Sequence, residues 1–529
     1  MFIKAFGSSV QGVDAITISI EVNVSMGQGY AVVGLPDSAV RESLHRTESA
    51  IKNMGFHMPR TKVIVNLAPA DIRKSGSALD LPIALGILGA SEQLDHVEKL
   101  KDFVVMGELS LDGTVNGIKG ALPIAIQAQK EGFRGLIVPK VNAKEASMVN
   151  ELEVYGVSTL KELVEFFSYE QILKREEMDT CDQFFNDRYL FNSNFNEVKG
   201  QAITKRAMEV AAAGGHNIIL IGPPGAGKTM LAKRLPTILP PLSLAEALET
   251  TKIYSVAGKL QHNSALISQR PFRSPHHTLS DIAMVGGGSN PQPGEISLAH
   301  HGVLFLDELP EFNRSVLEVL RQPLEERTIS IARTRVSQEF PASFMLVASM
   351  NPCPCGYYNH PQKECTCESG QVNRYLNKVS GPLLDRIDLH ITVGAMEFND
   401  MTSDTVEEDS FSIRERVIKA RAIQADRYKG KSGIYTNAQM TTQQLRKYCK
   451  IDRASTHELE DTMKKNHLSA RAYDRILKVS RTIADLAGSE QISFDHFAEA
   501  VRYRCLDKEG WGETRKSVKL EGKAIGGNN

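Results

Sequence analysis

An excess of charge of one sign, long apolar runs and scattered cysteines are all missing from this chain. The 62 lysines and arginines nearly balance the 63 aspartates and glutamates, so contact with a nucleic acid would need a local basic patch. No segment reaches the roughly 18 apolar residues that a membrane span needs, and the first residues lack the pattern of a secretory signal. We therefore expect a cytoplasmic protein with no membrane partner.

Cysteine is scarce, and its distribution argues against a disulfide framework. Four of the seven cysteines lie between positions 353 and 367. In a reducing compartment such a cluster fits a local metal site better than a set of disulfides. The 529 residues, 42% of them hydrophobic, predict an ordinary globular protein with about three domains.

A glycine-rich loop at residues 222–229 follows a short apolar run and precedes a segment that can form a helix. This is the context that the phosphate-loop motif requires. Glycines let backbone N–H groups surround the phosphates, Lys228 can neutralise their charge, and the Thr229 hydroxyl can bind Mg²⁺. The residues predicted to contact a nucleoside triphosphate are Gly222, Pro223, Pro224, Gly225, Ala226, Gly227, Lys228, Thr229 and Met230.

Two later apolar runs end in polar side chains that hydrolysis would need. The run 302–306 ends in Asp307, which would hold Mg²⁺ with Thr229, and in Glu308, which would polarise the attacking water. The run 343–350 ends in Asn351, which would sense the γ-phosphate. The alternative for this asparagine is that it only starts a turn before the next proline.

Arg386 follows this predicted sensor on a short helical segment. There it could reach the γ-phosphate of a neighbouring subunit as an arginine finger, which works in trans and implies a ring. The alternative is an ion pair within its own chain.

Hydrophobic periodicity divides the chain into five parts. We expect an α+β domain at 1–170, a linker at 171–196, an α/β nucleotide-binding core at 197–395 with a parallel sheet and helices on both faces, a helical lid at 396–510 and a disordered tail at 511–529.

The stretches 74–84 and 107–120 resemble the segments that carry the catalytic serine and lysine of Lon-type proteases. Aligned on their glycines, the two catalytic positions fall on Ala78 and Leu122. A nearby serine and lysine, one and three residues away, would point elsewhere on a regular element. We expect a Lon-like fold that is not an active protease.

The stretches 270–278, 294–302 and 381–388 closely resemble the magnesium-chelatase branch of AAA+ ATPases. With the Lon-like domain in front, residues 1–510 resemble the ComM/YifB family. This resemblance implies ATP and Mg²⁺ as cofactors and a homo-hexameric DNA translocase that promotes branch migration in recombination or natural transformation. Single-stranded or branched DNA and recombination proteins would be its partners. Arg471 would lie over the phosphates as a second sensor, or be a surface helix arginine.

Two segments bear on a DNA substrate. The insertion 273–296 carries glycines that would allow close approach to a strand in the pore. The segment 328–337 alternates like a hairpin, and its Arg333 and Arg335 could follow phosphates. The alternative is a solvated hairpin with two surface arginines.

Two other function classes stay open. The first is a magnesium-chelatase-type motor that remodels a protein partner and drives metal insertion into a tetrapyrrole. We expect likeness to chelatase motor subunits to cover only the ATPase part, which argues against this class. The second is a non-catalytic regulator, and the intact set of hydrolysis residues argues against it.

Cys353, Cys355, Cys365 and Cys367 form two close pairs that could bind tetrahedral Zn²⁺, with His360 as a substitute ligand. The one-residue spacing within each pair is shorter than usual. The alternative is a set of reduced thiols or a redox-sensitive pair. If bound, zinc would brace the loop after the sensor without taking part in the chemistry.

Two pairs of adjacent histidines, at 276–277 and 300–301, also suggest metal. Adjacent side chains on an extended segment face opposite ways, so we expect neither pair to chelate. We interpret them as structural, or as couplers to the nucleotide site.

Overall fold

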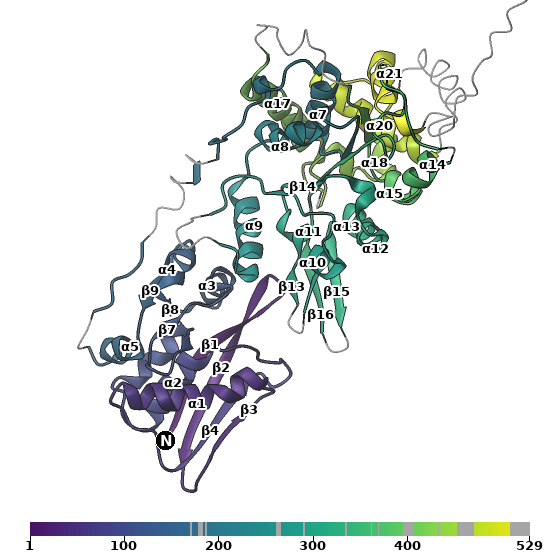
Figure 1. Cartoon of the computed structure of the whole chain (residues 1–529). Coiled ribbons are helices and arrows are strands. Elements are labelled where there is room, and N and C mark those ends of the chain that lie inside the picture. Colours follow the sequence, from purple (N-terminus) through teal and green to yellow (C-terminus); the bar gives the residue numbers. More distant parts are fainter. Residues whose placement is uncertain are drawn as a thin grey trace, which may run out of the picture.

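The computed structural model describes most of the chain in three parts (Figure 1). An N-terminal domain lies at one end, a sheet-based module in the middle and a group of helices at the other end (Figure 1). Within the described ranges, each helix is too short or too polar to span a lipid bilayer. The described residues are 1–169, 172–177, 184–185, 188–260, 266–288, 291–333, 336–360, 362–368, 370–394, 407–431, 433–451 and 470–507.

A seven-stranded mixed sheet forms the N-terminal domain, in the order β3-β4-β2-β1-β5-β8-β9. Strand β1 pairs antiparallel with β2 over its full length, and the tip of this hairpin points toward the sheet-based module (Figure 1). The strands are β1 (Phe2–Gln11), β2 (Asp14–Ser25), β3 (Tyr30–Val33), β4 (Lys62–Ala68), β5 (Phe103–Val105), β8 (Gly135–Pro139) and β9 (Glu153–Val157), with a small separate hairpin of β6 (Glu108–Leu109) and β7 (Val115–Asn116).

Helix α2 is buried along its whole length and forms part of the core of this domain. Its one ionisable side chain, Asp80, receives hydrogen bonds from Arg46 at 2.6 and 2.9 Å, which offset the cost of burying a carboxylate. The α+β domain predicted from the sequence is present. Its helices are α1 (Ser38–Asn53), α2 (Asp80–Ala90), α3 (Ala121–Lys130), α4 (Lys140–Ala146) and α5 (Leu160–Phe167).

The central module contains a five-stranded parallel sheet in the order β11-β14-β17-β10-β18. Alternate residues of β10 pack into two different hydrophobic clusters, so apolar side chains cover both faces of the sheet. This confirms the predicted α/β core. The strands are β10 (Ile218–Ile221), β11 (Phe272–Arg273), β14 (Val303–Leu306), β17 (Met345–Met350) and β18 (Leu389–Thr392).

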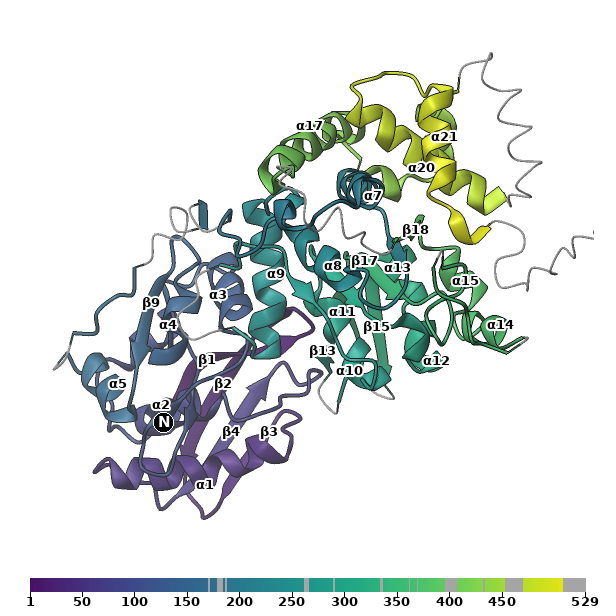
Figure 2. The same cartoon turned by 45° about the horizontal axis from the view of Figure 1, so that its top comes forward.

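Helices and two hairpins complete this module and the lid beyond it (Figure 2). The predicted hairpin at 328–337 forms β15 (Thr328–Arg333) and β16 (Val336–Pro341). The other elements of the module are α7 (Ala202–Gly214), α8 (Lys228–Ile238), α9 (Leu244–Ala257), α10 (Asp281–Val285), β12 (Gly286–Gly287), β13 (Gln292–Pro293), α11 (Glu295–Leu298), α12 (Arg314–Glu318), α13 (Arg321–Glu326), α14 (Gln371–Leu376) and α15 (Gly381–Leu384). The lid contains α17 (Ser410–Tyr428), α18 (Thr442–Tyr448), α20 (Ala470–Leu486) and α21 (Phe494–Arg502).

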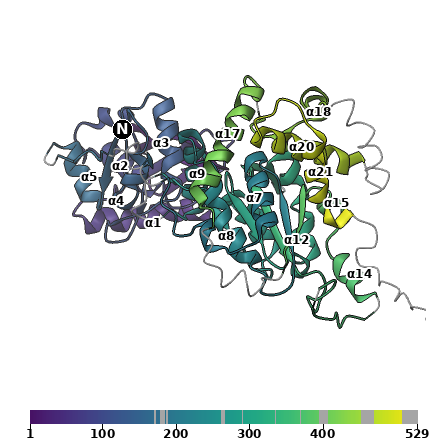
Figure 3. The ribbon, with the colours of Figure 1, turned by 90° about the horizontal axis from the view of Figure 1, so that it is seen from above.

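Helix α9 lies between the N-terminal domain and the rest of the central module (Figure 3). The Gly120 N–H donates to the Ser255 carbonyl at 3.1 Å, and the Lys252 ammonium lies 2.5 Å from a carboxylate oxygen of Asp14. Helix α9 therefore contacts the N-terminal domain through its backbone and through a side chain.

Candidate nucleotide-hydrolysis site

The phosphate loop links the end of β10 to the start of α8. Gly225 and Gly227 have φ of +79° and +80°, a conformation that a side chain would strain. The Lys228 ammonium donates to the loop carbonyls of Gly222 at 2.7 Å and Pro223 at 2.9 Å. Burial lowers the pKa of Lys228, although nearby carboxylates oppose this. A buried ammonium beside glycines at a helix N-terminus fits the phosphates of a nucleotide.

Two predicted Mg²⁺ ligands meet beside this loop. The Thr229 hydroxyl donates to Asp307 across 2.8 Å. Ser349, which is fully buried near the end of β17, donates to the other carboxylate oxygen of Asp307 and fixes its orientation. Hydroxyl and carboxylate oxygens suit Mg²⁺. Ser349 is not among the site residues predicted above, although its place two residues before Asn351, in the same predicted strand, was a signal for it.

Asn351 lies at the end of β17, and its side-chain oxygen accepts a hydrogen bond from Lys228 at 3.1 Å. The predicted sensor thus contacts the phosphate loop directly, because β17 and β10 are neighbours in the sheet.

Glu308, predicted to polarise water, follows Asp307 with φ of +55°, and its side chain is 57% exposed. His277 lies 3.8 Å from the Glu308 carboxylate, measured from Nδ1. Of the two interpretations of this histidine pair, a structural role or coupling to the nucleotide site, this contact favours the second.

The two predicted arginines bind carboxylates of their own chain. Arg386 lies 2.6 Å from Glu325, an ion pair of the kind that was the alternative to a finger acting in trans. Arg471, at the start of α20, has a 77% exposed side chain and lies 3.8 Å from Asp385. The contacts described for these two arginines, to Glu325 and the Pro382 carbonyl and to Asp385, lie away from the phosphate loop in sequence and include neither Thr229 nor Asp307.

The predicted DNA contacts stay predictions. The backbone of Arg333 ends β15, opposite Val336, while Arg335 lies outside the described residues.

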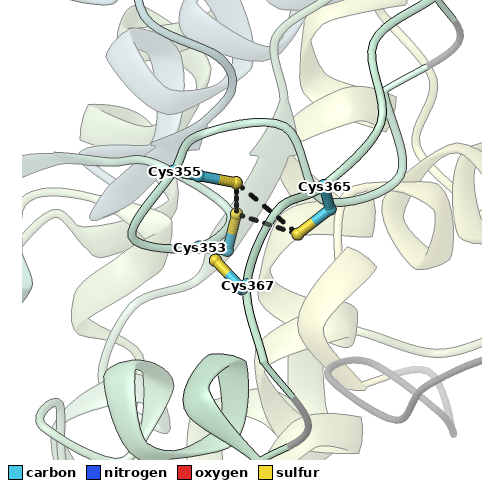
Figure 4. Close-up of side chains that lie close together, drawn as sticks. All are labelled: Cys353, Cys355, Cys365 and Cys367. Atoms are coloured by element: carbon cyan, nitrogen blue, oxygen red, sulfur yellow. Dashed lines mark hydrogen bonds between the residues drawn. The ribbon is translucent and has the colours of Figure 1, made fainter.

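Four cysteine thiols converge in the loop between β17 and α14 (Figure 4). The Sγ atoms of Cys353 and Cys355 are 3.3 Å apart, and Cys365 Sγ lies 3.7 and 3.5 Å from them. All four Sγ atoms lie within 4.8 Å of one another, and Cys367 completes the set. Sulfurs at the corners of a zinc tetrahedron, with Zn–S of about 2.3 Å, are about 3.8 Å apart.

His360 is engaged elsewhere. Its Nδ1 accepts backbone N–H groups at 3.1 and 3.0 Å, so this nitrogen is not free to act as a ligand beside the thiols.

The environment shifts the pKa values of two of the thiols. Burial raises the pKa of Cys353 to about 12, whereas N–H and thiol donors lower the pKa of Cys355 to about 6 against the effect of burial. Deprotonated sulfur is the form that binds metal.

The expectation that adjacent histidines face opposite ways is wrong for His300 and His301. The residue at 301 has φ of +55°, which turns the chain and lets both rings approach Glu249, at 3.4 and 3.0 Å. The Nδ1 atom of His300 accepts the Ser343 N–H at 3.0 Å, which assigns its proton to Nε2, the nitrogen that faces the carboxylate. The ligand atoms of these three residues lie within 4.8 Å of one another, but in this tautomer both ring nitrogens of His300 are occupied, Nδ1 by a backbone N–H and Nε2 by its own proton.

The Lon-like stretches line a cavity of about 320 Å³ in the N-terminal domain, together with residues of the ATPase module. Ala78 lines the cavity, and Leu122 is fully buried. The neighbouring Ser77 hydroxyl donates to Glu108. Lys119 also lines the cavity, and its aliphatic chain packs over Gly258 of the ATPase module. The two aligned catalytic positions thus hold side chains without a nucleophile or a base.

Comparison with known sequences covers nearly the whole chain. Residues 194–401 match the family described as magnesium chelatase, subunit ChlI, and residues 407–504 match its C-terminal family. The competence protein ComM of Haemophilus influenzae is 44% identical over 504 residues, which cover 95% of this chain and 97% of that protein. The chain belongs to the ComM/YifB family of magnesium-chelatase-like AAA+ ATPases.

Two further relatives extend this assignment. The uncharacterized protein YifB of Salmonella typhimurium is also 44% identical over 504 residues, covering 94% of this chain and 96% of that protein. Lon protease 2 of Bacillus subtilis is 29% identical over 160 residues, or 28% of each chain.

One expectation is corrected by these comparisons. Residues 20–142 match the family described as subunit ChlI of Mg-chelatase, so likeness to chelatase subunits is not confined to the ATPase part. The Lon-like N-terminal domain therefore does not argue against a chelatase-type motor.

Proposed function

We propose that this family member is an ATP-driven DNA translocase with helicase-like activity, built as a ring of six copies. Its role would be branch migration in recombination or natural transformation. The observation that carries the motor is the meeting of Lys228, Thr229, Asp307 and Asn351 at one edge of a parallel sheet. The DNA assignment is supported by the name of a relative, a competence protein, with which the chain aligns nearly end to end.

Each hydrolysis residue has a role that its position supports. Lys228 would bind the β- and γ-phosphates, and Thr229 with Asp307 would hold Mg²⁺, which offsets the charge that develops during transfer. Glu308 would accept the proton of the attacking water, with Asn351 orienting that water.

Arg386 would leave Glu325 and bind the γ-phosphate of a neighbouring subunit. The pair that it makes within the single chain is 2.6 Å long and involves a half-exposed carboxylate, so exchange for a phosphate would cost little. Arg471 would act on the nucleotide when the lid closes. These two roles make ring assembly part of the active site.

DNA would pass the β15–β16 hairpin, where Arg333 and Arg335 would contact phosphates without reading bases. Single-stranded or branched DNA would be the track, and recombination proteins would supply it. We place the protein in the cytoplasm, where DNA would be accessible as the track and thiols stay reduced.

We also infer that the four cysteines hold one structural Zn²⁺ per chain. Their sulfur spacings of 3.3 to 3.7 Å approach the edge of a zinc–thiolate tetrahedron. Elemental analysis of purified protein should give one zinc per wild-type chain and none in a Cys353→Ser/Cys365→Ser variant. Equal zinc in both proteins would remove this site.

DNA-stimulated ATP hydrolysis tests the motor. Turnover should rise several-fold on adding single-stranded or forked DNA, and Glu308→Gln should bind ATP and DNA without turnover. No stimulation together with no DNA binding in the presence of nucleotide would overturn the DNA assignment. If a protein partner alone stimulated the same turnover, the chelatase-type remodeller would replace it.

A further inference from the structure

The loop that carries the four cysteines lies directly against the phosphate loop. Gly356 faces Pro224: a Cβ atom built on this glycine would lie 2.5 Å from Cδ and 2.9 Å from Cγ of the proline ring. Real Cβ atoms do not approach carbon so closely, so the two loops are in contact through backbone and ring. Residues 132 positions apart in the chain, 224 and 356, thus meet at the nucleotide site.

This contact is part of the turn that the cysteines define. Gly356 donates its N–H to the Cys353 carbonyl at 3.0 Å, and Tyr358 donates its N–H to Cys353 Sγ at 3.3 Å. Cys353 is fully buried, and Cys355 adjoins the glycine. A metal held by these sulfurs would fix the turn on both sides of its contact with Pro224.

The two cysteines at the other end of the loop would bind the same ion. Cys365 and Cys367 return to the turn after a segment of nine residues, 356–364 (Figure 4). One ion bound by both thiolate pairs would close this segment into a loop and so lower the entropy cost of ordering it. Asn351, two residues before the first cysteine, contacts Lys228 at 3.1 Å. The chain around the four cysteines therefore contacts the nucleotide site at two points, Gly356 with Pro224 and Asn351 with Lys228.

We propose that metal occupancy of the four-cysteine cluster sets the affinity for ATP, because the metal-bound turn supports Pro224 and keeps the phosphate loop in its binding conformation. The proposal rests on ATP binding by the phosphate loop and is independent of DNA. It assigns to the metal a control of nucleotide binding rather than a role in the chemistry.

Two variants separate the metal from the contact. Gly356→Ala keeps all four thiols and should keep one zinc per chain, but its methyl group would push the turn away from Pro224. Cys353→Ser should lose the zinc. Both should bind a fluorescent ATP analogue, with Mg²⁺ and without DNA, about tenfold or more weakly than the wild type, a change of about 1.4 kcal/mol.

Gly370→Ala is the matched control. Gly370 lies in the same loop with φ of +80°, close to the +85° of Gly356, but a Cβ there would meet nothing within 4 Å. It imposes similar backbone strain without touching the phosphate loop, so zinc and ATP affinity should stay within twofold of the wild type. Circular dichroism would check that each variant is folded.

Wild-type ATP affinity in zinc-containing Gly356→Ala would overturn the proposal. So would wild-type affinity in Cys353→Ser that has lost its zinc. A wild type that binds no ATP analogue would instead overturn the proposed function. If DNA did not stimulate the wild type but both variants still bound ATP more weakly, this inference would be supported. That result would overturn only the DNA assignment.

Discussion

The phosphate-loop site and the cavity of the N-terminal domain have similar local architecture and different side chains. Both contain a glycine-rich loop that leads into a helix, with a serine or threonine and a lysine nearby. In the first, Lys228 and Thr229 reach a sensor and a carboxylate through hydrogen bonds of 3.1 and 2.8 Å. In the second, the aligned positions hold Ala78 and Leu122. A preserved fold and cavity therefore do not imply preserved chemistry.

The largest effect should come from the water-polarising carboxylate of the ATPase site. Glu308→Gln should lower kcat for ATP by about 10²- to 10³-fold, because an amide cannot accept the proton of the attacking water. Affinity for ATP should change little, since the side chain keeps its size. Steady-state turnover together with equilibrium ATP binding measures both quantities. Near-normal turnover would contradict the predicted role of Glu308. It would also mean that the catalytic difference between the phosphate-loop site and the N-terminal cavity does not depend on this residue.

A smaller effect is expected on the pH dependence of stability, which should differ between the two regions because each contains a buried carboxylate, Asp388 in one and Asp80 in the other. Arg475 at 3.0 Å and His216 at 3.3 Å hold the pKa of Asp388 well below its usual range, although burial opposes this. In the N-terminal domain, burial raises the pKa of Asp80 despite its bonds from Arg46. The two acids therefore have opposite linkage to pH.

Ionised Asp388 contributes stability above the unfolded pKa of about 4, and this is lost as pH falls toward its lower folded pKa. Asp388→Asn should therefore lower the local unfolding free energy of β18 by about 2–4 kcal/mol at pH 7, and by less below pH of about 4. Hydrogen exchange in β10 and β18 measures this change. Asp80 should show the reverse sign, losing stability as pH rises through about 4 toward its raised folded pKa. An unchanged exchange pattern for Asp388→Asn would contradict the assigned buried pair.

The smallest effect is expected in the cavity of the N-terminal domain. Ser77→Ala removes the hydroxyl that donates to Glu108, yet ATP turnover should stay within about twofold, because this hydroxyl lies outside the hydrolysis site. Wild-type protein should not hydrolyse a fluorogenic peptide or casein. Peptide hydrolysis that disappears in Ser77→Ala would show that this serine is a nucleophile after all.

Much of the ATPase site could be predicted because each part is local in sequence. Apolar runs that end in Asp307 and Asn351 predict strands, and parallel strands bring their ends to one edge. The Lon-like fold was visible in two glycine-rich stretches, and so was the absence of a catalytic pair at their aligned positions.

The features that sequence reasoning missed depend on contacts between distant segments. Strand β1, Phe2–Gln11, contains Gly7, Ser8 and Ser9, which hide its alternation, and it is ordered by pairing with β2 and β5. His300 and His301 approach one carboxylate because His301 adopts a left-handed backbone conformation. No sequence motif predicts that conformation. The contact between Gly356 and Pro224 joins two loops that only the folded sheet brings together.

Branch migration on a three-strand DNA substrate tests the central claim most directly. Wild-type protein with ATP and Mg²⁺ should extend the joint between strands, and Glu308→Gln or a non-hydrolysable ATP analogue should stop it. Extension that proceeds equally well with Glu308→Gln would contradict an ATP-driven motor. A wild type that hydrolyses ATP but never moves the branch point would contradict DNA as its track.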